Sequence, residues 1–307
     1  MPKFSITKST TINSPQEMVF TTVRDFHQWP TWSPWLIAEP DCDVNVAEDG
    51  MSYTWDGKIV GSGKMEILDE TPNNQISYRL TFLTPWKSVS SVSFSFQAKG
   101  EATEVTWTMD GSLPFFLFWM KKMMVAFVGM DYERGLSMLK DYCETGNVPS
   151  KLGFNGTQSF QGFSYIGLKT SCSIADMGDR MKSDFENLWA TVSEAKIEPT
   201  GKPFSIYHKH DPVSGRSEYT IGVPIVSTPS SIPSSLISGT IASCETWSVT
   251  HTGPYRHLGN PWSAGMMYAR AKAFKQQKGI HPFEVYDNDP TETSENDLQT
   301  TIHFAVK

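Results

Sequence analysis

The sequence predicts an α+β protein of two domains: an antiparallel sheet around a long C-terminal helix, followed by a duplicated β-α-β-β domain. Three observations lead to this prediction. Apolar and polar residues alternate in successive runs from Val44 to Met109, which is typical of antiparallel strands. A helical pattern over 115–144 follows these strands. A segment that begins at Pro203 returns at Pro282, 79 residues later, which indicates an internal duplication.

The length and composition fit two domains. At 307 residues the chain exceeds the size at which one hydrophobic core usually stops growing. With 39% hydrophobic and 12% aromatic residues, it can fill two cores. We expect the domains at 1–150 and 158–307, because the polar, glycine-containing segment 149–157 between them is typical of a linker.

The elements of the first domain follow from local patterns. Residues 3–12 alternate as a strand, and Asn13-Ser14-Pro15 then starts a short helix that reaches about Arg24. Three tryptophans and three prolines make 25–40 (DFHQWPTWSPWLIAEP) too broken for a regular element. Turns rich in Gly, Pro and Asn separate the strands that follow, so consecutive strands should form hairpins. The long helix packed in this sheet completes a helix-grip arrangement.

This order of elements resembles the START/polyketide-cyclase superfamily (SRPBCC). The resemblance covers nearly all of 1–150 and is carried by STTINSPQEMVFTTVRDFHQWPTWSPW, the GKMEI strand and the ending GLSMLKDYCE. Members of the superfamily bind or transform very different ligands, so the fold does not identify one. Six tryptophans either line an apolar cavity or fill the core, and we favour the core: Trp29, Trp32, Trp35, Trp55, Trp86 and Trp107.

The most apolar stretch is 113–130, LPFFLFWMKKMMVAFVGM. Lys121 and Lys122 interrupt it at the middle, where a membrane span tolerates charge least, so no membrane span is expected. We favour a buried or groove-covering helix here over an interfacial membrane anchor.

Charge and cysteine content limit the partners and the compartment. The net charge is -7, which lacks the basic surplus that binding to a phosphate backbone needs, so no direct nucleic-acid binding is expected. The N-terminus has no uninterrupted apolar region of the kind found in secretory signals. The four cysteines form no CxxC pair, which favours thiols in a reducing compartment. A cytoplasmic location is therefore expected, and the oligomeric state stays open.

The second domain contains the duplication. Residues 203–225 and 282–307 share Pro-Phe-x-aliphatic-Tyr, then Asp-Pro, a polar turn and a strand. Each copy follows a strand and an amphipathic helix, which we place at 162–170 with 176–196 and at 243–250 with 261–278. Two such β-α-β-β units related by a pseudo-twofold axis leave a cleft where the halves meet.

The two copies differ at one position that matters for chemistry. Where the first repeat has Ser205, the second has Glu284, between Phe283 and Val285. An unpaired carboxylate is costly in an apolar core, so Glu284 should either reach solvent on an edge strand or sit in a cleft. Alternation alone does not choose between these two.

The duplicated unit, with YRHLGNPW before the second helix and PFEVYDNDP after it, resembles the GyrI-like family, the effector-binding domain of AraC- and MerR-type multidrug-responsive regulators. The resemblance spans about Phe160 to Lys307. It implies that Glu284 lies at the floor of an aromatic cleft and meets cationic or polarised ligands. It also implies cleft walls from a further set of aromatic residues: Tyr207, Trp247, Tyr255, Trp262, Phe185 and Trp189.

Three functions follow from this resemblance. The first is a sensing, sequestering or resistance protein that binds small hydrophobic or cationic molecules. The second is a hydrolase of electrophilic, cyclopropane-bearing compounds, with Glu284 as general base and Trp262 or Tyr255 positioning the ligand. The third is a ligand-dependent modulator of a protein partner. The helix-turn-helix module of the family's regulators has no counterpart in these 307 residues, which disfavours direct transcriptional activation.

No cofactor or metal is expected. Neither a P-loop nor a GxGxxG pattern is present in the sequence. His208-x-His210-Asp211 has the spacing of two metal ligands on one face of a strand, but we favour turn chemistry for it because Asp211-Pro212 belongs to the repeated turn.

Overall fold

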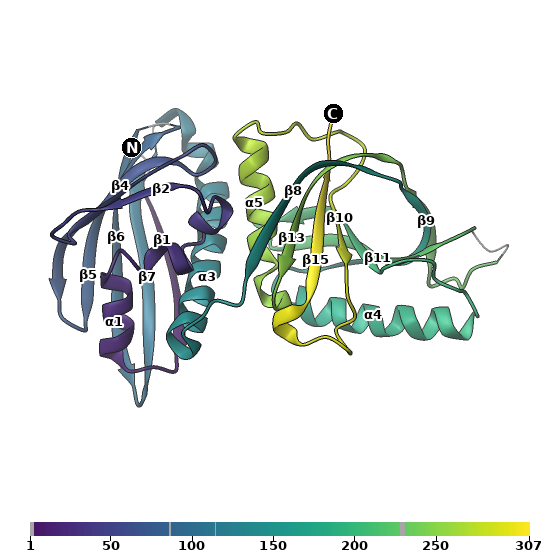
Figure 1. Cartoon of the computed structure of the whole chain (residues 1–307), viewed down its shortest axis with the longest axis horizontal. Helices are drawn as coiled ribbons and strands as arrows, with labels where there is room; N and C mark the ends of the chain where they lie inside the picture. The colour runs from purple at the N-terminus through teal and green to yellow at the C-terminus, as the bar shows by residue number, and fades with distance from the viewer. Residues whose placement is uncertain (1–2, 86, 114, 228–230) are drawn as a thin grey trace. The chain divides into compact units, whose positions relative to one another are not determined.

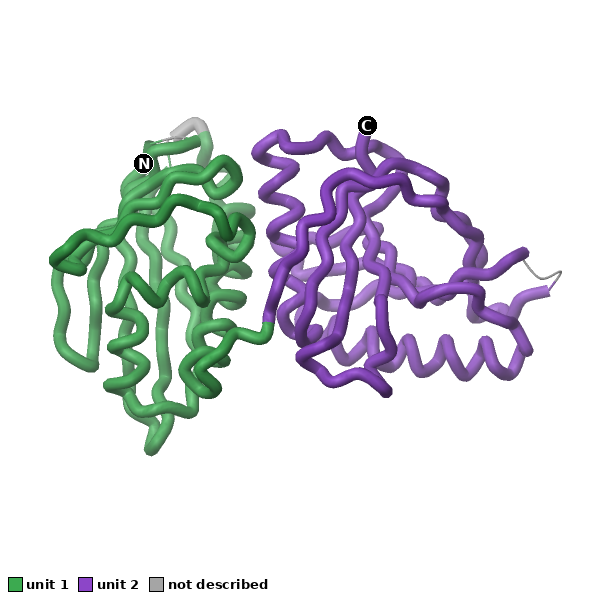
Figure 2. The backbone as a smooth tube through the Cα atoms, in the orientation of Figure 1, with its two compact units in different colours: residues 1–149 green, residues 150–307 purple. Residues whose placement is uncertain are grey.

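The computed structural model describes residues 3–85, 87–113, 115–227 and 231–307. They form two compact units, residues 1–149 and 150–307, drawn in green and purple in Figure 2. Both units are built on antiparallel sheets with helices, so the protein has the predicted α+β fold. Trp86 lies outside the described residues.

The first unit is a helix-grip fold (Figure 1). Its sheet has the order β1-β7-β6-β5-β4-β3-β2, in which each strand pairs antiparallel with its neighbours. The long helix α3 packs against β1. The elements are β1 (Lys3–Ile12), α1 (Gln16–Arg24), α2 (Trp29–Trp32), η1 (Leu36–Ala38), β2 (Asp43–Val46), β3 (Ser52–Gly57), β4 (Gly61–Thr71), β5 (Gln75–Thr84), β6 (Ser88–Lys99), β7 (Ala102–Ser112), η2 (Phe115–Met120) and α3 (Lys121–Thr145).

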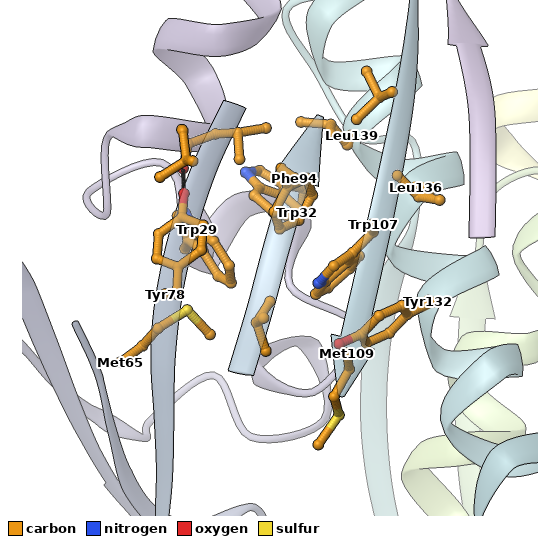
Figure 3. Close-up of a cluster of buried hydrophobic side chains, with 14 of the residues drawn as sticks. Trp29, Trp32, Met65, Tyr78, Phe94, Trp107, Met109, Tyr132, Leu136 and Leu139 are labelled. Atoms are coloured by element: carbon orange, nitrogen blue, oxygen red, sulfur yellow. Dashed lines mark hydrogen bonds between the residues drawn. The ribbon is translucent and has the colours of Figure 1, made fainter. Parts of the chain in front are cut away.

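Aromatic rings fill the interior of this unit, as Figure 3 shows. The ring of Trp107 stacks between those of Phe94 and Tyr132, with centroid distances of 4.7 and 3.8 Å. Trp29 and Trp32 are almost completely buried beside them, with ring centroids 4.7 Å apart. These tryptophans therefore serve as core side chains, which was the favoured alternative.

The apolar stretch 113–130 differs from its prediction. The helix expected over 115–144 is divided into η2 and α3, and several side chains at its start point to solvent. Met124, Val125 and Val128 pack against the core, as expected of a groove-covering helix. Phe118, Trp119 and Phe127 are exposed, so the expectation holds for one face of this stretch only. Within the described residues, no helix combines the length and apolarity that crossing a bilayer requires.

The second unit is one sheet with an internal symmetry. Its order is β12-β9-β11-β10-β14-β15-β13-β8. When each strand is replaced by its counterpart in the other repeat, the result is the same strand order, read from the opposite edge of the sheet. The strands are β8 (Lys151–Phe160), β9 (Phe163–Ser173), β10 (Phe204–Asp211), β11 (Arg216–Ile225), β12 (Ile237–Ile241), β13 (Cys244–Thr252), β14 (Phe283–Tyr286) and β15 (Gln299–Ala305).

Each repeat carries one strand more than the sequence indicates. β8 precedes the first repeat but pairs with β13 of the second, and β12 precedes the second repeat but pairs with β9 of the first. The two halves thus exchange their edge strands. β8 also occupies most of the segment 149–157 in which we expected a linker, and the second compact unit begins at residue 150.

One helix of each repeat packs on the sheet. α4 (Met177–Glu194) packs against β9 and β11, and α5 (Gly259–Arg270) packs against β13 and β15. The second helix was expected to reach Lys278. It ends earlier, because Lys272 adopts a left-handed backbone conformation with φ of 63°. The chain that follows joins the sheet through a bridge between Gln276 and Val306.

Candidate functional site

The site lies where the two repeats meet in the sheet. β10 and β14 are its two central strands, and Ser205 pairs directly with Glu284. The pairing is symmetric, since the backbone N–H of Tyr207 donates to Pro282 and that of Tyr286 donates to Pro203. The matched positions of the duplication are therefore neighbours at the symmetry centre.

Alternation along these strands separates two faces. Side chains two residues apart share a face, so Ser205, Tyr207, Glu284 and Tyr286 lie together. The alternate residues Phe204, Ile206 and Phe283 belong to a cluster on the opposite face, together with Tyr165 of β9 and Ile241 of β12. The sheet thus places the carboxylate among hydroxyl groups and keeps it away from that cluster.

The carboxylate of Glu284 is buried and held by three donors. The side chain is only 1% exposed. The indole N–H of Trp262 donates to Oε1 over 2.5 Å. The hydroxyls of Tyr286 and Tyr207 donate to Oε2 over 2.8 and 3.1 Å. Because β14 is a central strand, the alternative of an outward-facing Glu284 on an edge strand is excluded.

Ser205 extends this network. Its hydroxyl lies 2.9 Å from the hydroxyl of Tyr286, which itself donates to Glu284. Because the tyrosine proton is directed at the carboxylate, Ser205 donates to the tyrosine oxygen. The serine of the first repeat therefore supports the carboxylate of the second through one tyrosine.

Burial determines the protonation of these groups. It raises the pKa of Glu284 above its usual value, while the hydrogen bonds from Trp262, Tyr286 and Tyr207 act in the opposite direction. Burial and the nearby carboxylate raise the pKa of Tyr255 to about 12. Burial and the same carboxylate also hold the pKa values of Tyr207 and Tyr286 well above their usual value, so these two hydroxyls stay protonated donors at neutral pH. Glu284 is the group of this set whose charge responds to pH.

Aromatic rings from both helical segments surround this network. Phe185 of α4 meets the ring of Tyr286 edge-on at 5.4 Å between centroids. Tyr255 in η3 (Tyr255–His257) approaches the same ring at 5.8 Å. Trp262 of α5 meets Tyr207 at 4.8 Å. Four of the residues predicted as cleft walls are thus gathered around Glu284.

The other two predicted wall residues lie apart from this network. Trp247 belongs to the core beneath α5, where it stacks on Phe274 with centroids 4.8 Å apart and packs against Tyr268. Trp189 lies on α4 and is 43% exposed.

Sequence reasoning missed Tyr286, Ser205 and Met181. Tyr286 was identifiable, because it is the repeat counterpart of Tyr207 and lies two residues after Glu284 on a strand. The sulfur of Met181 on α4 lies 3.8 Å from the hydroxyl oxygen of Tyr207, whose proton is directed at Glu284. Nothing in the sequence marks this methionine apart from its place on the apolar face of the helix.

The histidine cluster on β10 has other contacts. His208 Nε2 lies 2.7 Å from the hydroxyl of Thr220. Asp211 accepts hydrogen bonds from the backbone N–H groups of Val213 and Ser214, which is the turn chemistry we favoured. The described residues include no group of three or more His, Cys, Asp or Glu side chains that could hold a metal ion.

Comparison with known families matches both units. The family described as polyketide cyclase / dehydrase and lipid transport matches residues 3–144. The GyrI-like small molecule binding domain matches residues 159–307. The chain is a fusion of these two families. Small-molecule binding belongs to the GyrI-like domain, which carries Glu284.

Several solved structures are similar to parts of the chain. A cryo-EM structure of an EcmrR-DNA complex has 14% identity and a TM-score of 0.45, over 61% of this chain and 68% of that chain. The crystal structure of the EcmrR C-terminal domain has 16% identity and a TM-score of 0.43, over 52% and 98%. CalU16 from Micromonospora echinospora has 17% identity and a TM-score of 0.33, over 45% and 73%. A search of the curated proteins finds no match.

Proposed function

We propose that the GyrI-like domain binds small hydrophobic or cationic molecules at the aromatic site around Glu284, and that the protein senses or sequesters them or confers resistance to them. The observation that carries this proposal is a carboxylate 1% exposed that receives three hydrogen bonds from aromatic side chains. Within the described part of the chain, no ion pair includes Glu284.

An unneutralised carboxylate in such a place favours a cationic ligand. Burying a charge without an opposite charge is unfavourable, and the raised pKa of Glu284 reflects this. An organic cation would supply the missing charge. The faces of Tyr207, Trp262 and Tyr286 would add cation–π attraction, which demands little of the ligand's shape. Broad specificity for lipophilic cations and for flat apolar molecules follows.

Isothermal titration with an aryl quaternary ammonium compound and its neutral isostere tests this proposal. Glu284→Gln keeps the size of the side chain and removes its charge. We expect the variant to bind the cation about 5- to 150-fold more weakly, which corresponds to roughly 1 to 3 kcal/mol. Affinity for the neutral isostere should change little. Unchanged affinity for the cation would place the ligand site elsewhere, and an equal loss for both ligands would show a general disruption of the fold.

A hydrolase is the second candidate, and the raised pKa of Glu284 is the observation that favours it. A carboxylate with a raised pKa is a better general base, able to take a proton from a water that attacks a strained electrophilic ring. Trp262 or Tyr255 would then position the substrate. In this case Glu284→Gln should abolish turnover of a cyclopropane-bearing electrophile while the affinity for a neutral substrate analogue is kept. Turnover unaffected by the substitution would remove this candidate.

A further inference from the structure

We propose that the first unit binds the surface of an anionic lipid membrane with the end at which α3 begins. This inference is independent of the Glu284 site. Large apolar side chains that are 38% to 65% exposed gather at this end, and we call them the apolar end patch: Leu83, Val89, Phe118, Trp119, Met123 and Phe127.

Strand register places these residues at one end of the sheet. Phe82 of β5 pairs with Ser88 of β6, so Leu83 and Val89 flank the hairpin that joins the two strands. Lys3 at the start of β1 pairs with Ser112 at the end of β7, immediately before η2. Because β1, β7, β6 and β5 are consecutive neighbours, their ends share one edge. Figure 1 shows the N-terminus and the first turns of α3 at this same end.

The charge around the patch is basic, although the chain as a whole carries -7. Lys121 and Lys122 are exposed beside Trp119, and no acidic residue occurs between positions 112 and 130. Lys3 and Lys121 line one shallow hollow, together with Asp110. Two further exposed lysines lie in turns at this end, Lys58 and Lys87, and the carboxylate of Glu39 accepts hydrogen bonds from the backbone of the turn that contains Lys58.

This combination fits a lipid surface better than a second copy of the chain. Exposed Trp and Phe rings enter the headgroup region of a bilayer, while lysine side chains reach anionic headgroups from its edge. In a symmetric dimer formed through this patch, the same lysines would face each other and repel. The patch is thus complementary to an anionic partner with an apolar interior.

Vesicle sedimentation of the full chain tests the proposal. We expect the protein to sediment with vesicles of phosphatidylglycerol and phosphatidylcholine and to stay in solution with phosphatidylcholine alone, and binding should weaken with added salt. Trp119→Ser combined with Phe127→Ser should lower the partition coefficient by about tenfold or more. Lys121→Glu combined with Lys122→Glu should lower it to a similar extent, roughly tenfold or more.

Matched changes in the second unit are the controls. Lys275→Glu with Lys278→Glu alters the net charge equally, and Val213→Ser removes another exposed apolar side chain. Both should keep wild-type vesicle binding. Equal binding to the two vesicle types, no binding to either, or an equal effect of the control variants would overturn the proposal. So would a dimer in analytical ultracentrifugation that dissociates on Trp119→Ser without any vesicle binding.

Discussion

Ser205 and Glu284 face each other across the two central strands of the GyrI-like domain, and Tyr286 joins their side chains by hydrogen bonds of 2.9 and 2.8 Å. Duplication gave both repeats this position, but only the second has a charge there. Because only one repeat has a glutamate at this position, the symmetry centre holds a single carboxylate. Two would be direct neighbours on one face, where like charges repel and one of them would bind a proton.

The first prediction concerns the support that Ser205 gives to this network. Ser205→Ala leaves the buried oxygen of Tyr286 without its donor, so we expect a loss of about 1 to 2 kcal/mol in the free energy of unfolding. Urea denaturation measures it. Ser159→Ala, at an exposed position, is the control and should be neutral. Stability unchanged by Ser205→Ala would mean that Tyr286 finds another donor.

The second prediction concerns the hydrogen bond from Trp262 to Glu284, which lowers the pKa of the carboxyl group. Trp262→Phe keeps an aromatic ring but removes the N–H, so the pKa of Glu284 should rise further. Cation affinity requires the ionised carboxylate and falls as the pH drops through this pKa. The pH range in which cation affinity is lost should therefore move to higher pH in the variant. Titration with the quaternary ammonium compound at several pH values measures this shift.

The control for this shift is Trp189→Phe, which changes an exposed tryptophan on α4. Its pH profile should match that of the wild type. Identical pH profiles for Trp262→Phe and the wild type would mean that cation binding does not depend on the ionisation of Glu284.

Much of this architecture could be predicted from local patterns. The first strand was predicted over 3–12 and is β1, Lys3–Ile12, because alternation and the following Asn13-Ser14-Pro15 mark both its ends. The duplication gave the order of the central elements and made Ser205 and Glu284 equivalent. The exchange of β8 and β12 was not predictable in this way. It depends on pairing between distant segments, and the Gly and Asn residues of β8 make it resemble a linker.

The positions of Trp247 and Trp189, the two predicted wall residues that lie apart from Glu284, could not be derived from the family resemblance or from alternation. Trp247 is on β13, which is separated from β14 by β15. Its strand therefore lies about 10 Å from the strand of Glu284, counted across the sheet in the direction of the hydrogen bonds. Alternation gives the face of a strand but not its place in the sheet. Trp189 follows Phe185 by about one turn, yet Leu188 beside it takes the buried position. The rotation of α4 on the sheet decides this, and it depends on the packing of both partners.

The third prediction concerns the close packing of α5 against the sheet. A Cβ added at Gly265 would lie 2.2 Å from the ring of Phe304, and Trp262 packs on that same ring at 5.5 Å. Gly265→Ala should therefore push α5 away, cost about 1 to 3 kcal/mol of unfolding free energy and weaken cation binding by displacing Trp262. Thermal unfolding and titration report the two effects.

Gly178 of α4 provides the matched control, since an added Cβ there meets nothing within 4 Å. Gly178→Ala should leave ligand affinity unchanged and stabilise the chain by up to about 1 kcal/mol. A Gly265→Ala variant that is as stable as the wild type would show that Phe304 or the helix adjusts without cost.

The fourth prediction concerns the pH dependence of stability. His251 is completely buried, its Nε2 lies 3.0 Å from the hydroxyl of Ser150, and the amide of Asn260 donates to that same hydroxyl. Burial, with a smaller contribution from His257, lowers the pKa of His251 to about 4. In the unfolded chain, His251 therefore gains a proton as the pH falls below about 6.5. In the folded chain it gains this proton only below about pH 4. The stabilisation is complete above pH 6.5 and is lost as the pH falls through this window.

Between pH 7 and pH 5 this histidine alone should remove about 2 kcal/mol from the free energy of unfolding. His251→Gln cannot titrate, so the variant should lose less stability over the same interval by roughly that amount. Urea denaturation at several pH values measures both slopes. His303, whose pKa burial also lowers to about 4, is present in both proteins and leaves a residual slope in each. Equal slopes for the two proteins would mean that His251 gains a proton in the folded state at ordinary pH, which its burial beside Ser150 argues against.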